Sequence, residues 1–125
     1  MSRIWLTLED VLDIHARQIA EFGGSNGLRD AGALEAALFR PRSGYYDDLI
    51  AEAAALWESL SHNHAFIDGN KRTALASTII FLGLNGVELT ATPDALMDFL
   101  LPLYEKQQLE FNTLEAWLRE NTRAV

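Results

Sequence analysis

Apolar residues recur every three or four positions along most of the chain, in stretches that glycine, proline and asparagine separate. This spacing is typical of α-helices with one buried face, because each helical turn takes about 3.6 residues. The first stretch follows Thr7, with Asp10 placed as in a capping box, and stops at Gly23-Gly24. The second begins at Asp30 and ends before Pro41. We expect one helix in each stretch.

Two further helical stretches occupy the middle of the chain. An alanine-rich stretch runs from Leu49 to about Asn63, with Asp47 or Asp48 as its N-terminal cap. The stretch from about Asn70 to Asn85 is apolar on nearly every side, which indicates a helix surrounded by others. We therefore place this helix at the centre of the fold.

The C-terminal third predicts two more helices and a short extended segment. Thr92-Pro93-Asp94 begins the first helix, and we expect Pro102 to kink or split it. Asn112, with Glu115 three residues later, begins the last helix. Residues 87–89 are suited to brief extended pairing but too few to build a sheet. The chain thus predicts an all-α fold, a compact helical bundle around the apolar helix at 70–85.

Composition and charge narrow the class of protein. The chain has 125 residues, of which 49% are hydrophobic and 22% charged, as expected for a single domain over residues 1–125. The absence of cysteine excludes disulfide scaffolds, thiolate zinc sites and thiol nucleophiles. No apolar run is long enough to cross a membrane and the N-terminus lacks signal-peptide features, so we expect a cytoplasmic protein. A formal net charge of -8 makes nucleic acid and anionic membranes unfavourable partners.

The densest group of polar side chains lies between the two central helices. It occupies residues 62–72, which read His-Asn-His-Ala-Phe-Ile-Asp-Gly-Asn-Lys-Arg. Asp68-Gly69-Asn70 stands where the central helix begins, so unpaired backbone N–H groups and the positive end of the helix dipole meet there. Lys71 and Arg72 add two full positive charges. Together these groups indicate a phosphate-binding site.

The same segment also contains the residues that a transfer reaction needs besides a phosphate-binding site. Asp68 is a carboxylate among anion-binding groups, and its simplest role is to hold a divalent cation that bridges phosphate oxygens. His64 is four residues earlier, and an imidazole takes a proton from a hydroxyl near neutral pH. Phe66 is apolar and is expected to anchor the loop in the core. This combination predicts phosphoryl or nucleotidyl transfer.

Residues 64–72 resemble the signature of the Fic/Doc family, which runs His-x-Phe-x-Asp/Asn/Glu-Gly/Ala-Asn-Gly/Lys-Arg. Upstream segments are similar to the pattern of the Doc branch, the death-on-curing toxins: Glu21–Gly24, Gly27–Asp30, Leu34–Ala37 and Arg40-Pro41. The resemblance implies a Fic-type helical bundle. Typical Fic adenylyltransferases have glycine where Lys71 stands and a second arginine where Leu75 stands, so Lys71 favours the Doc branch.

The resemblance implies the toxin of a toxin–antitoxin module. Such a toxin transfers the γ-phosphate of ATP to a hydroxyl of elongation factor Tu and so arrests protein synthesis. His64 would act as the general base and Asp68 would hold Mg²⁺. Four further residues of the signature would bind the nucleotide: Gly69, Asn70, Lys71 and Arg72. Of these, Lys71 and Arg72 would also act in catalysis, by neutralising charge, whereas Phe66 would be a structural anchor.

The resemblance also implies two protein partners. In this family a loop upstream of the signature docks the target, and the candidate here is the expected exposed loop at 40–46, with Arg40, Arg42 and Tyr45. Doc-type toxins are inhibited by a Phd-like antitoxin whose C-terminal segment lies in a groove. The internal inhibitory motif of some Fic proteins, Ser/Thr-x-x-x-Glu-Gly/Asn, is absent because alanine stands at residue 116. We therefore expect inhibition by a separate chain.

Two alternatives stay open from the sequence. One is the transfer of AMP to a protein hydroxyl by the same loop, against which Lys71 counts. The other is a non-catalytic regulator that binds a nucleotide or a metal, in which His62, His64 and Asp68 would hold a transition metal.

Overall fold

A computed structural model describes residues 2–125 of the protein, which form six α-helices, one 3₁₀ turn and two short strands. In chain order these are α1 (Leu8–Phe22), α2 (Ala31–Phe39), η1 (Arg40–Arg42), α3 (Leu49–His62), α4 (Asn70–Leu84), β1 (Val87–Leu89), α5 (Pro93–Lys106), α6 (Phe111–Glu120) and β2 (Thr122–Ala124). The predicted all-α class is confirmed.

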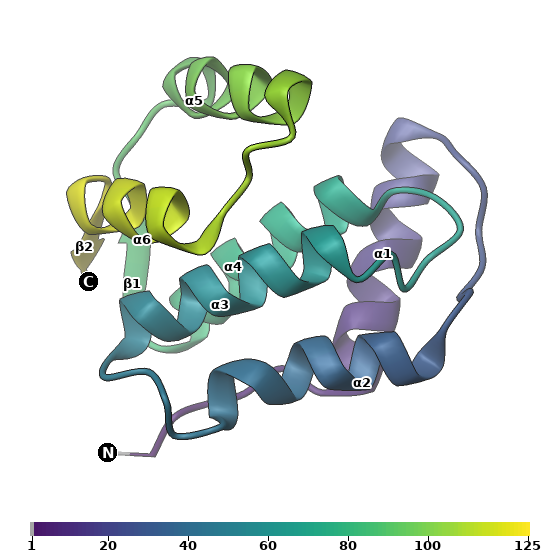
Figure 1. Ribbon diagram of the computed structural model, residues 1–125, viewed down its shortest axis with the longest axis horizontal. Helices are drawn as coiled ribbons and strands as arrows, with labels where there is room; N and C mark the ends of the chain where they lie inside the picture. Colours follow the sequence, from purple (N-terminus) through teal and green to yellow (C-terminus); the bar gives the residue numbers. More distant parts are fainter. Residues whose placement is uncertain (1) are drawn as a thin grey trace.

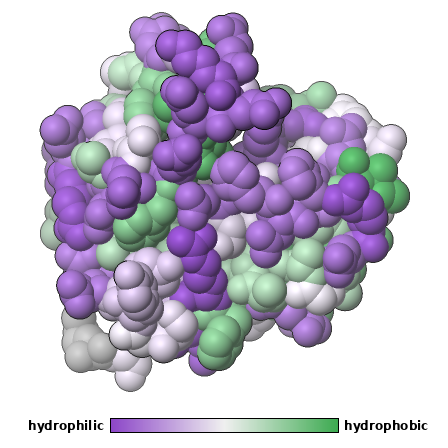
Figure 2. Space-filling model, in the orientation of Figure 1, coloured by the Kyte–Doolittle hydropathy of each residue, from purple (hydrophilic) through white to green (hydrophobic). Residues whose placement is uncertain are grey.

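The helix predicted at the centre of the bundle is α4. It packs along α3 and against α1, while α2 and α6 pack on the other sides of α3 (Figure 1). Its fully buried side chains include Ala74, Phe81 and Leu82, which face the core. The rest of the core comes from neighbouring helices, above all from Leu34, Leu56, Trp57, Leu100, Leu114 and Leu118. Polar side chains cover most of the face seen in Figure 2, with smaller apolar patches between them.

Most of the helices begin with a side-chain cap at the residue that the sequence predicts. Thr7 and Asp10 form the expected capping box at the start of α1. Asp30, Asp48 and Thr92 each accept a hydrogen bond from the backbone N–H three residues later. Because a cap needs only residues that are close in sequence, these starts can be predicted from the sequence alone.

Three details of the predicted elements differ in the structure. The helix α5 continues through Pro102 without splitting, and both Pro102 and Asp98, whose carbonyl the proline leaves unpaired, are exposed to water. The helix α6 begins at Phe111 rather than Asn112, because Glu58 of α3 accepts a hydrogen bond from the Phe111 N–H (2.7 Å). The expected loop at 40–46 begins with η1, whose Pro41 is buried.

Residues 87–89 do pair, and their partner comes from the other end of the chain. The strands β1 and β2 run antiparallel, with Val87 opposite Ala124 and Leu89 opposite Thr122. The Asn85 side chain exchanges two hydrogen bonds with the backbone of Ile4 (2.8 and 2.9 Å). Both ends of the described chain therefore meet at the C-terminal end of α4. Within residues 2–125, no helix is long and apolar enough to span a membrane.

Candidate active site

The loop between α3 and α4 is held in place by the segment that precedes α2. Arg29 and Asp30 both donate backbone N–H groups to the Ala65 carbonyl (2.7 and 3.0 Å). The Ile67 N–H donates to the Gly27 carbonyl (3.1 Å), next to an isolated antiparallel bridge at Phe66. The loop is therefore part of a small hydrogen-bonded layer, although it carries no regular secondary structure of its own.

Phe66 is buried in the core, as expected of a structural anchor. Its side chain is buried and stacks on the imidazole of His15, with ring centroids 3.8 Å apart. The Nε2 of His15 donates a hydrogen bond to the Asp68 carbonyl (2.8 Å). The Asn70 side chain closes the same turn, because its amide accepts from the Phe66 N–H and donates to the Phe66 carbonyl (both 3.0 Å). The Asn70 side chain is thus engaged within the loop.

His64 has a strained backbone and an exposed imidazole. Its φ of 50° lies in the left-handed region, which costs a residue other than glycine about 1–3 kcal/mol. The Arg29 guanidinium donates a hydrogen bond to the His64 carbonyl and so holds this conformation. Strain of this kind is concentrated at functional sites, where the surrounding structure fixes it.

The first turn of α4 presents backbone donors beside this histidine. Gly69 is the N-cap, with φ 77°, and no side chain caps the helix. A Cβ at Gly69 would lie 3.1 Å from Ile19 and 3.4 Å from Arg72, so glycine also allows the close packing of this turn. The N–H groups of residues 70–72 and the helix dipole therefore face outward, where they favour an anion.

Asp68 is an exposed carboxylate that two backbone donors orient. Its Oδ2 accepts from the Ser25 N–H (3.2 Å) and its Oδ1 from the Gly69 N–H (2.8 Å). These two hydrogen bonds, and then the charge of Arg72, lower the pKa of Asp68 below its usual value. A Cβ at Gly24 would lie only 2.6 Å from Asp68 Oδ2, so the glycine lets the segment after α1 approach the carboxylate.

The two cations of the signature are placed differently. The Arg72 guanidinium donates to the carbonyls of Gly23 (2.9 Å) and Gln18 (3.5 Å), which ties its charge to the C-terminal end of α1. The Lys71 ammonium is exposed and lies 5.0 Å from the ring centroid of Tyr104, in α5. Burial raises the pKa of the Tyr104 phenol. One charge is held by hydrogen bonds, whereas the other lies over an aromatic ring.

These groups line two adjoining hollows. We call the first the signature hollow; its volume is about 420 Å³ and its lining consists of His64, Ile67, Asp68, Gly69, Asn70, Lys71, Arg72 and Tyr104. We call the second the α5 hollow; its volume is about 330 Å³ and its lining consists of Ser61, His62, His64, Lys71, Leu103, Tyr104, Gln107 and Leu109. The buried Ser61 hydroxyl has no hydrogen-bond partner in the described part of the chain. The structure thus brings every predicted polar residue of the signature to one hollow.

The donor set fits magnesium better than a transition metal. Among the described residues no three histidine, aspartate or glutamate side chains gather as a metal site. His62 is engaged elsewhere, since its Nε2 donates to the Leu109 carbonyl. The transition-metal site of His62, His64 and Asp68 is therefore wrong. A single exposed carboxylate beside a phosphate cradle suits Mg²⁺, which keeps several waters and binds through one or two carboxylates and substrate phosphates.

The residues predicted to dock a target lie outside both hollows. The Arg40 guanidinium donates to Tyr46, Glu58 and Ser59 (2.7, 2.7 and 2.9 Å), so it ties η1 to α3. The Arg42 guanidinium lies over the ring of Trp5 at 5.5 Å. Tyr45 is 82% exposed, and its ring packs edge-on against Tyr46.

Sequence reasoning missed the residues that reach the site from a distance. These are His15 and Ser25 around Asp68, Arg29 at His64, and Tyr104 at Lys71. The Gly27–Asp30 segment stands out in the sequence as family-like, but nothing in the spacing shows that it contacts the His64 loop. No local pattern marks Tyr104, which lies among apolar packing residues of α5.

Comparison with known proteins gives a consistent result. Residues 5–82 match the model of the Fic/DOC family. Toxin Doc of Mycolicibacterium smegmatis is 48% identical over 95 residues, which cover 72% of this chain and 71% of that protein. Protein kinase doc of Escherichia phage P1 is 36% identical over 90 residues, which cover 69% of this chain and 71% of that protein. The family match includes the whole signature and ends before α5.

Proposed function

Because the chain belongs to the Fic/DOC family, we propose that it is the toxin of a toxin–antitoxin module and transfers the γ-phosphate of ATP to a protein hydroxyl. The names of the two relatives support a toxin and a kinase-type phosphotransferase. One observation carries the chemistry: His64, Asp68 and the uncapped first turn of α4 line the same hollow.

The signature hollow supplies the groups that phosphoryl transfer needs. The N–H groups at the start of α4, together with Lys71 and Arg72, bind and neutralise phosphate oxygens. Asp68 would hold Mg²⁺, which when bound neutralises phosphate charge and orients the phosphates. Like any aspartate, Asp68 is ionised at neutral pH, and its hydrogen bonds lower its pKa further.

His64 is the general base of this proposal. It takes the proton of the target hydroxyl as the hydroxyl oxygen bonds to the γ-phosphorus. The bond between that phosphorus and the bridging oxygen breaks, and ADP leaves with the electron pair. Most of the acceleration comes from positioning and from charge stabilisation, as in other phosphoryl transfers.

Lys71 favours phosphate transfer over AMP transfer. The lysine stands where adenylyltransferases of the family have glycine, and its side chain occupies space beside the phosphate cradle. The nucleotide would then bind in the opposite direction, with its terminal phosphate next to His64. AMP transfer is the second candidate, since the same base and cradle serve it.

We propose elongation factor Tu as the target and the cytoplasm as the location. Purified elongation factor Tu is incubated with the protein, Mg²⁺ and ATP that carries separate labels on the adenosine and the γ-phosphate. Transfer of the γ-phosphate label alone supports the proposal, and transfer of the adenosine label would show the second candidate. Transfer of neither label would reject both for this target.

His64→Ala tests the base directly. The variant is expected to lose transfer by at least a hundredfold, since general-base catalysis contributes about 10²–10⁴-fold. It should keep its unfolding temperature, because the imidazole is exposed. A variant that transfers phosphate at the wild-type rate would remove His64 from this role.

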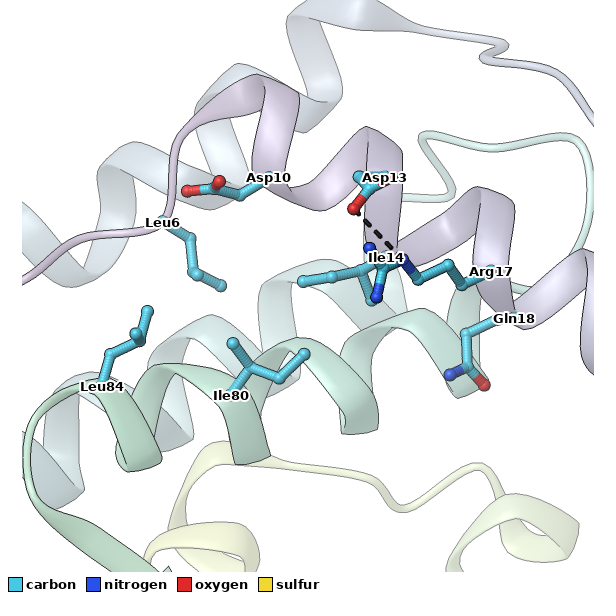
Figure 3. A pocket seen from close by; sticks show the side chains of 8 residues that line it. All are labelled: Leu6, Asp10, Asp13, Ile14, Arg17, Gln18, Ile80 and Leu84. Atoms are coloured by element: carbon cyan, nitrogen blue, oxygen red, sulfur yellow. Dashed lines mark ion pairs between the residues drawn. The ribbon is translucent and has the colours of Figure 1, made fainter.

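We propose a surface groove between α1 and α4 as the docking site of an antitoxin segment. The groove has a volume of about 300 Å³, and Leu6, Ile14, Ile80 and Leu84 form its apolar floor (Figure 3). Asp10 and Asp13 lie on its α1 side. Arg17 of the same lining pairs with Asp13 (3.3 Å), so an amphipathic helix that places a basic residue beside Asp10 would complement this surface. At one end of the groove the Gln18 carbonyl accepts a hydrogen bond from Arg72, which also lines the signature hollow.

A further inference from the structure

The signature hollow and the α5 hollow meet at three side chains. His64 and Lys71 belong to the signature, whereas Tyr104 comes from α5. The family model ends at residue 82, so this helix lies outside the matched region. Tyr104 is thus a wall of both hollows that comes from outside the signature.

Lys71 has few contacts that could fix its charge. Among the residues that the structure describes, no carboxylate pairs with its ammonium. The ring of Tyr104, 5.0 Å from the lysine Nζ, is the aromatic group in contact with it. Lysine has a long, flexible side chain with large rotamer entropy, so an unanchored ammonium spreads over many positions. A cation–π contact with the ring restricts that spread.

We propose that Tyr104 is a positioning residue for Lys71, whose ammonium it holds at the boundary of the two hollows so that the transferred phosphate stays beside His64. The inference rests on the proposed function, because it concerns the same nucleotide. With the charge fixed before binding, the nucleotide does not have to order the lysine, which improves both affinity and placement.

The substitution series separates the ring from the hydroxyl. Tyr104→Phe keeps the aromatic face and removes the hydroxyl, whereas Tyr104→Leu removes the ring and keeps an apolar side chain. Exposed cation–π contacts correspond to about a two- to fivefold change in an equilibrium constant. We therefore expect Tyr104→Leu to weaken ATP binding about two- to fivefold in calorimetry and to lower the transfer rate. Tyr104→Phe is expected to match the wild type in both measurements.

A double-mutant cycle with Lys71→Met tests whether the ring acts through the lysine. In the Lys71→Met background, Tyr104→Leu is expected to cause no further loss of ATP affinity. Phe99→Leu is the matched control, because Phe99 lies on the same helix and stacks on Trp117 instead of Lys71. It should lower the unfolding temperature without changing ATP affinity.

Nuclear magnetic resonance detects the contact between Lys71 and Tyr104 without a measurement of transfer activity. The chain has two lysines, Lys71 and Lys106, so their side-chain signals are readily assigned. The ring is expected to shift the Lys71 ε-protons upfield, and Tyr104→Leu to abolish the shift while Tyr104→Phe retains it. Absence of the shift in the wild type would overturn the proposal.

Two results of the binding series would also overturn it. One is an equal loss in Tyr104→Phe and Tyr104→Leu, which would assign the effect to the hydroxyl. The other is a full Tyr104→Leu loss in the Lys71→Met background, which would give the ring a different partner. If the wild type binds ATP but transfers no label, the proposed function fails, while the binding cycle still decides the role of Tyr104. If it binds no ATP, both fail.

Discussion

The strained backbone of His64 depends on a residue 35 positions earlier. Arg29 donates to the His64 carbonyl, and its own N–H donates to Ala65. The left-handed conformation has an energetic cost that these bonds offset, so the backbone of His64 is held in place without a bound ligand. The Arg29 guanidinium contacts the His64 carbonyl and does not line the signature hollow, so Arg29 is a positioning residue.

Arg29→Met is therefore expected to lower the rate of transfer by about ten- to a hundredfold, since a hydrogen bond from a charged group is worth about 1.5–3 kcal/mol. ATP affinity should stay unchanged, because the cradle at the start of α4 is intact. Single-turnover rates and calorimetry measure the two effects separately. Arg17→Met, at an exposed surface pair, is the control and should change neither. A parallel loss of ATP affinity in Arg29→Met would contradict this role.

Gly24 shows how closely the backbone approaches Asp68. Gly24→Ala places a Cβ 2.6 Å from Asp68 Oδ2, at a φ of 118° that side chains rarely adopt. The variant is expected to lose about 1–3 kcal/mol of unfolding free energy and to bind ATP with Mg²⁺ more weakly. Gly83→Ala, inside α4 with open space around it, should instead stabilise the protein by up to about 1 kcal/mol. Denaturant unfolding compares the two.

Helix starts that depend on a local side-chain cap were predictable from the sequence. A helix start that depends on a contact with another helix was not. Thr7, Asp30 and Asp48 act on N–H groups three residues away, so the sequence contains the whole interaction. The start of α6 depends on Glu58, which is 53 residues from Phe111 and belongs to another helix. The site follows the same division. The contiguous signature was identified, whereas Ser25 and Tyr104, which only packing brings close, were not.

Asp48 connects one helix start to another helix. Its carboxylate caps α3 and also pairs with Arg119 of α6 (3.0 and 3.1 Å). The hydrogen bonds from Arg119, and then that from the Ala51 N–H, lower the pKa of Asp48. A carboxyl group with a lowered folded-state pKa stabilises the fold above its unfolded pKa and loses that effect as the pH falls.

We expect the stability that the Asp48 charge contributes to be lost progressively as the pH falls from about 4, the unfolded pKa, toward the lowered folded pKa. Asp48→Asn keeps a good cap but no charge, so it should be slightly less stable at pH 7 and lose less on acidification. Asp48→Ala loses the cap as well, at about 1 kcal/mol. Urea unfolding at pH 7 and pH 3 checks both. Equal acid sensitivity of Asp48→Asn and the wild type would show that the Arg119 pair contributes nothing.

Across the whole molecule, the groove between α1 and α4 and the signature hollow are separate surfaces that meet near Arg72. Ile80→Asp places a charge on the apolar floor of the groove, and Ile79→Asp makes the same change one residue away, outside its lining. Burial of an isoleucine is worth about 1.5–3 kcal/mol, so Ile80→Asp should weaken antitoxin binding more than tenfold. ATP affinity should not change in either variant. Equal antitoxin binding by both variants would place the segment elsewhere.

The two ends of the described chain lie together at the end of α4 that is opposite its N-terminal turn (Figure 1). A helix of 15 residues is about 22 Å long, so this length separates them from His64 and Asp68. An affinity handle or fluorescent protein fused at either terminus is therefore held away from the reactive side. A protein immobilised by such a handle would present the signature hollow to the solution, which suits surface-based binding measurements.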